Sequence, residues 1–189
     1  DATWDVGIAF GTVGVRKGDH KLEITTYRAE AYDRASRKPE VTYGDSLADD
    51  LVRRDFTVNA LAVRLPSWEL VDLHDGVGDL GRRVLRTPGT PEESFSDDPL
   101  RMMRAARFAS TLGFDVAPEV VAAMEAMYGR LAIVSAERVR DELVKLVLGA
   151  HPRAGLTLMV STGLAELVLP ELRALALEVD EHHRHKDVY

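Results

Sequence analysis

The chain has 189 residues, of which 46% are hydrophobic and 29% are charged. This composition is typical of a globular protein and excludes an intrinsically disordered one, and the length suits one large domain or two small ones. Its 24 Lys and Arg residues against 31 Asp and Glu residues give a net charge of −7, which excludes a nucleic-acid coat protein held by overall positive charge.

The sequence also limits where the protein works. It contains no cysteine, which excludes disulfides and zinc–thiolate sites. It has no apolar run of about 18 residues and no signal-peptide pattern, so we expect a soluble, cytoplasmic protein. Because the chain begins at Asp1 without a Met and stops at Tyr189 just after a histidine-rich run, we expect a fragment at both ends.

Residues 1–90 predict a mixed α/β region. Residues 8–15 are apolar and β-branched, and residues 21–27 alternate with period 2 after a turn-like segment, so a β-hairpin is expected. We then predict a short helix over 56–63 and a strand over 69–73. A short extended piece at 84–87 precedes the breaker sequence Pro-Gly-Thr-Pro.

Beyond Pro91 the pattern is helical throughout. Ser96, Asp97 and Asp98 predict an N-terminal cap for a helix over 100–112, which Gly113 closes. Further helices are predicted over 118–128, 137–148, 152–162 and 164–169. With no strand expected after Pro91, the predicted fold class is α+β, an α/β head followed by an all-helical neck and body.

The densest chemical signal is the sequence Arg53-Arg54-Asp55-Phe56-Thr57-Val58-Asn59-Ala60. Guanidinium groups bind phosphate oxygens in a bidentate fork, and a helix N-terminus adds free N–H groups for the same anion. Asp55 could accept a hydrogen bond from a ribose hydroxyl, with Asn59 about one turn away. The structural alternative is an exposed charged cap with Asp55 as the N-cap.

A second signal is the recurrence of Arg101, Arg104 and Arg107 at every third position of one predicted helix. This spacing keeps the three guanidinium groups on one broad face, which suits a planar or phosphate-bearing partner. A carboxylate and a guanidinium one turn apart, such as Asp98 and Arg101, can hydrogen-bond the edge of a nucleobase. The alternative is that Asp98 caps the helix and the arginines form salt bridges on a solvated face.

Four weaker features have structural explanations beside the functional ones. Glu23 on the second hairpin strand is a metal ligand only if partner carboxylates exist. Residues 72–79 could suggest a calcium loop, but a turn between strand and helix is favoured because the distal Glu of an EF-hand is absent. Residues 137–142 carry alternating charges, which favours a salt-bridged surface or a helix-packing clamp. The histidines within 182–185 stay undecided.

Five motifs stand in a fixed order along the chain, at residues 10–13 with 23–28, 53–60, 72–80, 97–101 and 137–142. In this order they resemble the palm hairpin, the RRDFTxNA motif, the flexible D-x-x-x-G-x-x-D-L hinge segment, the nucleotide-selecting E-D-x-x-R motif and the neck-stabilising motif of one family. That family is the bacterial-type (class II) CCA-adding tRNA nucleotidyltransferases with the related bacterial poly(A) polymerases. Asp97 stands where the family usually has Glu.

The resemblance implies an enzyme that adds C, C and A to the 3′ end of tRNA from CTP and ATP without a nucleic-acid template. The implied partners are tRNA, ATP and CTP, with neither membrane nor DNA. Glu23 is implied to complete a carboxylate trio with an Asp-x-Asp pair that holds two Mg²⁺ ions.

The resemblance also implies roles for the other candidate residues. Arg53, Arg54 and Asn59 would contact the triphosphate and sugar, and Asp55 would favour ribose. Asp98 and Arg101 would read the edge of the base. Arg104 and Arg107 would contact the nucleotide or the tRNA backbone, or would brace the neck.

The expected domain organisation follows the same family. Residues 1–90 would form the C-terminal part of the palm or head, 91–150 a helical neck with the nucleotide-selecting motif, and 151–189 the start of a helical body leading to a truncated HD-like region. The Gly-rich segment and Asp-x-Asp pair expected upstream of Phe10 are not in this sequence, so the parent protein is expected to be active and the fragment inactive. Poly(A) addition and a noncatalytic RNA- or nucleotide-binding remnant stay open as alternatives.

Overall fold

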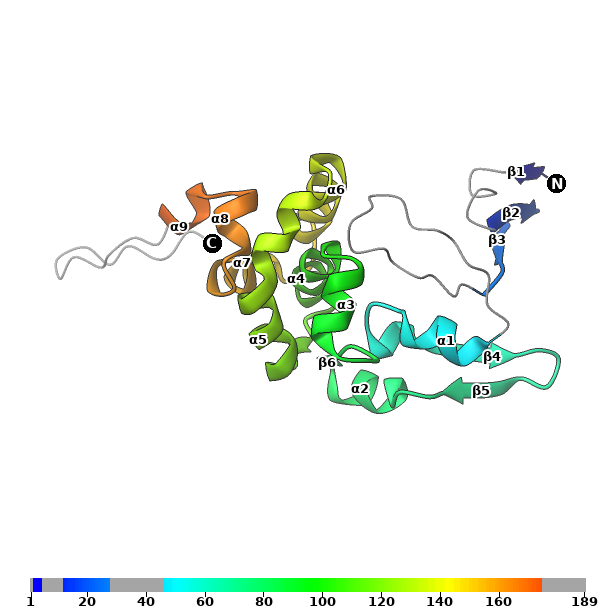
Figure 1. Cartoon of the computed structure of the whole chain (residues 1–189). Coiled ribbons are helices and arrows are strands. Elements are labelled where there is room, and N and C mark those ends of the chain that lie inside the picture. The colour runs from blue at the N-terminus through cyan, green and yellow to red at the C-terminus, as the bar shows by residue number, and fades with distance from the viewer. Residues whose placement is uncertain (1, 5–11, 28–45, 175–189) are drawn as a thin grey trace. The chain divides into compact units, whose positions relative to one another are not determined.

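The computed structural model of the chain describes residues 2–4, 12–27 and 46–174 (Figure 1). The fold is mixed α+β, as predicted, and it divides into two compact units, residues 1–53 and residues 54–189. Within the described ranges, no helix is long and apolar enough to cross a membrane.

The first unit contains the predicted hairpin. Strands β1 (Ala2–Trp4), β2 (Thr12–Lys17) and β3 (His20–Thr25) form an antiparallel sheet in that order, which confirms the hairpin from residue 12 onward. Gly18 begins the tight turn between β2 and β3 at a φ of 58°, a left-handed conformation that glycine adopts without steric cost. Helix α1 (Leu47–Val52) follows, and its N-cap Ser46 accepts a hydrogen bond from the Asp49 amide.

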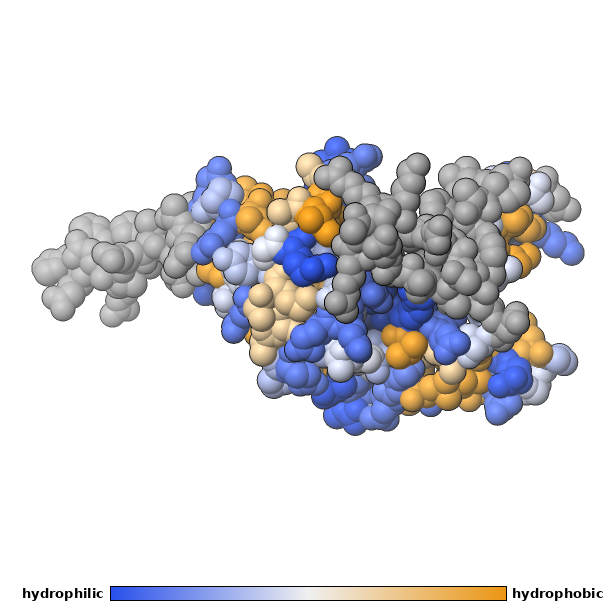
Figure 2. Space-filling model, viewed as in Figure 1, coloured by the Kyte–Doolittle hydropathy of each residue, from blue (hydrophilic) through white to orange (hydrophobic). Residues whose placement is uncertain are grey.

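The second unit begins with a β-hairpin where a helix was expected. A single 3₁₀ turn, η2 (Thr57–Asn59), leads into β4 (Leu61–Arg64), which pairs with β5 (Glu69–Asp72) in an antiparallel register from Leu61 opposite Asp72 to Arg64 opposite Glu69. The helix predicted over 56–63 is therefore wrong, because an isolated helix of that length is marginal and strand pairing satisfies the same backbone groups. Figure 2 shows hydrophobic residues on the surface of this hairpin, where Val63 and Leu70 are half exposed.

A short helix and a short strand follow this hairpin, and the strand pairs with another that lies later in the chain. Helix α2 (Gly76–Arg82) is followed by β6 (Val84–Leu85), which pairs in parallel with β7 (Asp115–Val116). The expectation of no strand beyond Pro91 is therefore wrong: β7 exists because β6 offers it backbone hydrogen bonds from far back in the chain.

Helix α3 (Pro91–Asp97) was missed, although the sequence carries its start signal. Thr90 is the N-cap and Pro91 occupies the first turn. The Thr90 hydroxyl accepts a hydrogen bond from the Glu93 amide and donates one to the Glu93 carboxylate. Thr-x-x-Glu is the sequence signature of a capping box, here with proline at the first helical position and with Glu93 bonded to the Thr90 hydroxyl, so the Pro-Gly-Thr-Pro breaker also starts a helix.

The helices predicted after residue 99 are confirmed to within about two residues at each end. They are α4 (Leu100–Leu112), α5 (Pro118–Met127), α6 (Ala136–Val147), α7 (Pro152–Ser161) and α8 (Leu164–Val168), with a 3₁₀ helix η3 (Tyr128–Ile133) after α5 and the short α9 (Glu171–Ala174) last. Gly113 ends α4 in a left-handed conformation with a φ of 63°, as its position predicted.

Helix α4 is the centre of the second unit. Its residues Met102, Met103, Ala105 and Ala106 are buried, and it packs against both α6 and α7. Helices α4 and α7 approach closely at Gly155, as shown by the fact that a Cβ atom there would lie only 2.6 Å from the Ala106 carbonyl oxygen. The arginines of α4 therefore project from a helix that packs against both α6 and α7.

Candidate functional site

The predicted site residues fall in both compact units. Glu23 and Arg53 belong to the first unit. The others belong to the second: Arg54, Asp55, Asn59, Asp98, Arg101, Arg104 and Arg107. Phe10, Arg28 and the histidine-rich run of 182–185, which the sequence analysis also singled out, lie outside the described residues.

Glu23 is an exposed residue of β3. The strand register places it opposite Gly14, which in turn lies opposite Trp4. Residues directly opposite in an antiparallel sheet point to the same face. The Trp4 indole covers Gly14 on that face, since a Cβ atom there would lie 2.0 Å from Trp4 Cε2.

The described residues do not fit a two-metal site. Nowhere in residues 2–4, 12–27 and 46–174 do three or more His, Asp or Glu side chains gather in a group that could hold a metal ion. Among the residues that the structure describes, Glu23 therefore has no carboxylate partners with which to bind a metal, and its assignment as a metal ligand stays a prediction.

Asp55 is buried and its carboxylate accepts four hydrogen bonds. Oδ1 accepts from the Phe56 amide at 2.9 Å and from Asn59 Nδ2 at 3.0 Å, while Oδ2 accepts from Arg104 Nε at 2.8 Å and from Arg104 Nη2. The structure thus brings together Asp55, Asn59 and Arg104, across 49 residues of chain. Asp55 is not the N-cap of a helix, because no α-helix forms here.

Two opposing effects act on the Asp55 carboxyl. Burial raises its pKa, because a charge is costly away from water. The charge of Arg104 and the hydrogen bonds from Asn59, Arg104 and Phe56 outweigh burial and leave the pKa below its ordinary value of 3.8. Asp55 is therefore an ionised, oriented carboxylate at neutral pH.

The three arginines of α4 contact three different neighbours. Arg101 Nη1 donates to the Ser94 carbonyl oxygen at 3.2 Å and to Ser94 Oγ at 2.9 Å. Arg104 forms the bidentate pair with Asp55, and Arg107 Nε donates to the carboxylate of Glu142, which is buried on α6. The salt-bridge alternative therefore describes Arg104 and Arg107, although both pairs lie between elements and not on a solvated face.

Asp98 and Arg101 lie one turn apart, as predicted, but their side chains have separate partners. Asp98 Oδ1 accepts from the Leu100 amide at 3.1 Å, and Oδ2 accepts from Arg138 Nη2 on α6 at 2.8 Å. The N-terminal cap predicted at residues 96–98 is wrong, because Ser96 and Asp97 belong to the end of α3 and Pro99 is the N-cap of α4. The expected clamp at 137–142 is confirmed, since Arg138 and Glu142 both tie α6 to the α4 region.

Sequence reasoning missed Ser94 and Arg138 as partners of the candidate residues. The capping box at Thr90 and Glu93 would have predicted α3 and hence a helical position for Ser94 beside the next helix. No local signal could have paired Arg138 with Asp98, because the two residues are 40 positions apart and meet through helix packing.

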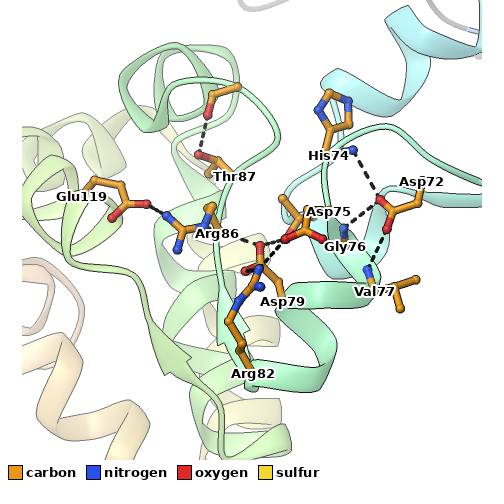
Figure 3. Close-up of polar contacts among 12 residues, drawn as sticks. Asp72, His74, Asp75, Gly76, Val77, Asp79, Arg82, Arg86, Thr87 and Glu119 are labelled. Carbon is orange, nitrogen blue, oxygen red and sulfur yellow. Dashed lines mark hydrogen bonds and ion pairs between the residues drawn. The ribbon is translucent and has the colours of Figure 1, made fainter.

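The acidic segment 72–79 is a structural turn, as favoured over a calcium loop (Figure 3). Asp72 accepts hydrogen bonds from the amides of His74, Gly76 and Val77 at the start of α2. The Val77 bond is the main cause that lowers the pKa of Asp72, against the opposing effect of desolvation. Its carboxylate oxygens are thus already engaged by the backbone.

Asp79 is fully buried and joins α2 to the candidate motif of residues 53–60. Its carboxylate accepts from Thr57 Oγ1 at 2.8 Å and from Arg82 at 2.7 Å, and lies 3.5 Å from Arg86 (Figure 3). Burial raises the pKa of Asp79. The hydrogen bonds and charges of these partners lower it by a larger amount, so the net pKa is below 3.8. The backbone amide of Thr57 also donates to the Arg86 carbonyl at 2.8 Å.

Comparisons with known proteins point in one direction. Two family models match the chain: the poly(A) polymerase head domain over residues 1–86, and the probable RNA- and SrmB-binding site of polymerase A over residues 113–175. Among curated proteins, the CCA-adding enzyme of Levilactobacillus brevis is 46% identical over 163 residues, which is 86% of this chain and 41% of that protein. The CCA-adding enzyme of Streptococcus gordonii is 41% identical over 96% of this chain and 45% of its own length.

Solved structures give the same result. The crystal structure of the Bacillus stearothermophilus CCA-adding enzyme in complex with CTP is similar with a TM-score of 0.78 at 39% identity, covering 87% of this chain and 39% of that one. A tRNA nucleotidyltransferase complexed with a primer tRNA and an incoming ATP analogue is similar with a TM-score of 0.69 at 29% identity, covering 88% of this chain and 50% of that one. The chain spans about two fifths of the length of the first curated relatives it matches.

Proposed function

The chain belongs to the family of CCA-adding tRNA nucleotidyltransferases and bacterial poly(A) polymerases, and from this premise we propose that its protein adds the CCA sequence to the 3′ end of tRNA from CTP and ATP. The observation that carries the proposal is the 41–46% identity to proteins named CCA-adding enzymes over 85–96% of the chain. This similarity favours CCA addition over poly(A) addition.

The geometry of the second unit supports a nucleotide-binding role. Asp98 and Arg101 place a carboxylate and a guanidinium one helical turn apart at the start of α4. A carboxylate accepts hydrogen bonds from an exocyclic amino group, and a guanidinium donates to ring and carbonyl acceptors, so the pair suits the amino-bearing bases cytosine and adenine. A site that relies on such bonds rejects a base that leaves its polar groups unpaired.

The motif of residues 53–60 is proposed to bind the sugar and phosphates. Arg54 and Asn59 are exposed and Arg53 is half-buried, which suits contact with a triphosphate. Asp55 is engaged by Arg104 and Asn59, so we propose that it orients Asn59 and favours ribose through that oriented group. Arg104 and Arg107 are proposed to brace the neck, since each is paired with a buried carboxylate.

The reaction is proposed to depend on a metal, as nucleotidyl transfer by this family generally does, and Mg²⁺ is the ion we propose because it suits carboxylate and phosphate oxygens. Of the described residues, Glu23 is the one carboxylate that we assign to it, and we assign no step of the reaction to the metal. We also propose that residues 1–90 are the C-terminal part of a palm or head, that residues 91–150 are a helical neck, and that residues 151–189 are the start of a helical body leading to an HD-like region. We propose that the protein acts on tRNA in the cytoplasm.

The proposal is tested by incubating the full-length protein with Mg²⁺, CTP, ATP and a tRNA that lacks its CCA end. We expect two C residues and one A residue to be added, read at single-nucleotide resolution on a sequencing gel. Long A tails without C would identify a poly(A) polymerase. Nucleotide binding without extension would identify a noncatalytic remnant, and either result would overturn the proposal.

A further inference from the structure

The two groups proposed to read the base are each held by a side chain that the sequence did not predict. Arg138 Nη2 donates to Asp98 Oδ2 at 2.8 Å, and the Leu100 amide donates to Oδ1 at 3.1 Å. Ser94 Oγ lies 2.9 Å from Arg101 Nη1, and the Ser94 carbonyl oxygen lies 3.2 Å from the same atom. The carboxylate and the guanidinium are therefore oriented separately, from two different helices.

The corner between α3 and α4 is where these holding contacts converge. Arg138 reaches it from α6, while Arg130 of η3 donates to the Ser96 carbonyl at 3.2 Å. Ser94 is itself buried on α3, so its hydroxyl has a defined direction. Arg138 is more than half exposed and Asp98 is one quarter exposed, and an ion pair this open to solvent adds little to folding stability. Its chief effect is on the direction of the Asp98 carboxylate.

Direction matters because the competing bases differ in hydrogen-bond polarity at one position. Cytosine and adenine carry an amino group that donates to a carboxylate. Uracil and guanine carry a carbonyl oxygen in the corresponding position, and this acceptor would face the lone pairs of the Asp98 carboxylate. Rejection of these two bases therefore requires that the Asp98 and Arg101 side chains cannot turn to suit them.

We propose that Arg138 and Ser94 are positioning residues for nucleotide selection: Arg138 sets the Asp98 carboxylate and Ser94 sets the Arg101 guanidinium, without either touching the nucleotide. This inference rests on the proposed function of the Asp98–Arg101 pair. Loss of either side-chain contact weakens the hold on one member of the pair, although Asp98 keeps the bond from the Leu100 amide and Arg101 keeps the bond to the Ser94 carbonyl oxygen, so UTP and GTP are rejected less strongly.

The test compares Arg138→Ala and Ser94→Ala with matched controls in the full-length protein. Arg140→Ala removes a different arginine of α6, one whose ion pair with Asp141 has both side chains exposed. Ser161→Ala removes a hydroxyl that donates to the Leu158 carbonyl oxygen within α7. Calorimetry measures the dissociation constants of CTP, ATP, UTP and GTP, and steady-state extension of tRNA measures kcat and KM for each.

We expect the preference for CTP over UTP, and for ATP over GTP, to fall roughly 5- to 50-fold in Arg138→Ala and Ser94→Ala. The two controls should keep the wild-type ratios, and Arg138→Lys should recover part of the preference because its ammonium group can still donate to Asp98. Unchanged ratios in both alanine variants, measured below their melting temperatures, would overturn the inference. A wild-type protein that binds CTP and ATP selectively but extends no tRNA would instead contradict the proposed function, since the binding ratios test the positioning roles without transfer.

Discussion

At the residue scale, Asp55 shows how a polar group of the candidate site also stabilises the fold. Its two carboxylate oxygens accept bonds from Asn59, from the Phe56 amide and from the Arg104 guanidinium, and little of the side chain reaches solvent. An unpaired carboxylate in this place would be costly to bury, so the paired state is what makes its burial possible. The same contacts orient Asn59, which we propose to meet the nucleotide.

Replacing Asp55 with Asn should therefore lower the free energy of unfolding by about 2–3 kcal/mol at neutral pH, because the partly exposed Arg104 loses a buried charged partner. The loss should depend on pH. The folded-state pKa of Asp55 lies below 3.8, so its stabilisation is fully present above that value and disappears as the pH falls through the folded-state pKa. Urea unfolding of both proteins across this range measures the effect.

The matched control is Asp141→Asn, which breaks an ion pair exposed on both sides and should cost less than about 1 kcal/mol. Wild-type protein and the Asp55→Asn variant should converge in stability at the acid end, where the Asp55 carboxyl is protonated in both states. A difference between them that stays constant down to the lowest pH would rule out this account of Asp55.

At the element scale, the position of the arginines on α4 depends on how closely α7 approaches. Gly155 allows this approach, since an added Cβ atom would lie 2.6 Å from the Ala106 carbonyl oxygen and 2.9 Å from Leu146 Cγ. Backbone cannot give way as a flexible side chain can. The close contact between α4 and α7 therefore depends on the absence of a side chain at Gly155.

Gly155→Ala should destabilise the protein by about 1–3 kcal/mol, because the new methyl group overpacks the junction of α4 and α7. Gly81→Ala, also within a helix, is the control: a Cβ atom there meets nothing within 4 Å, so the higher helix propensity of alanine should leave stability unchanged or raise it by about 0.5–1 kcal/mol. Thermal unfolding of the two variants gives the comparison. Equal melting temperatures would show that α7 moves away from α4 without cost.

At the scale of the whole molecule, the main hydrophobic core belongs to the second unit. Its buried members run from Phe56, the residue just before η2, to Leu172 on α9. The described part of the first unit, by contrast, leaves Leu22 and Ile24 of β3 more than half exposed. Burial of apolar surface is the dominant favourable contribution to folding, so the two units should differ in autonomous stability.

A polypeptide of residues 54–174 should consequently fold alone, with a helical circular dichroism spectrum and one cooperative thermal transition. Residues 1–53 expressed alone should give no cooperative transition, because those of them that the structure describes (2–4, 12–27 and 46–53) contribute no member to the core cluster of buried residues. A fragment of residues 54–174 that melts gradually or lacks helix would mean that its core needs the first unit.

The sequence by itself determined the elements whose signals are local. Gly113 closes α4, Pro118 and Pro152 open α5 and α7, and alternation predicts the β2–β3 hairpin, because caps and periodicity act within a few residues. The five motifs likewise located the candidate site residues and their family. The start signal of α3 at Thr90, Pro91 and Glu93 is equally local, but Pro91 signals both the end of the preceding segment and the first turn of a helix.

The tertiary structure decided which side chains meet. Leu61–Arg64 became a strand because β5 offered backbone partners, and β7 exists because β6 does. Arg104 of α4 pairs with Asp55 across 49 residues of chain, and Arg138 of α6 pairs with Asp98 across 40 residues. The even spacing of the arginines on α4 does not by itself indicate these partners. The reason is physical: a hydrogen bond needs its partners within about 3 Å, and such distant residues come that close because α4 packs against α6 and against the segment that carries Asp55.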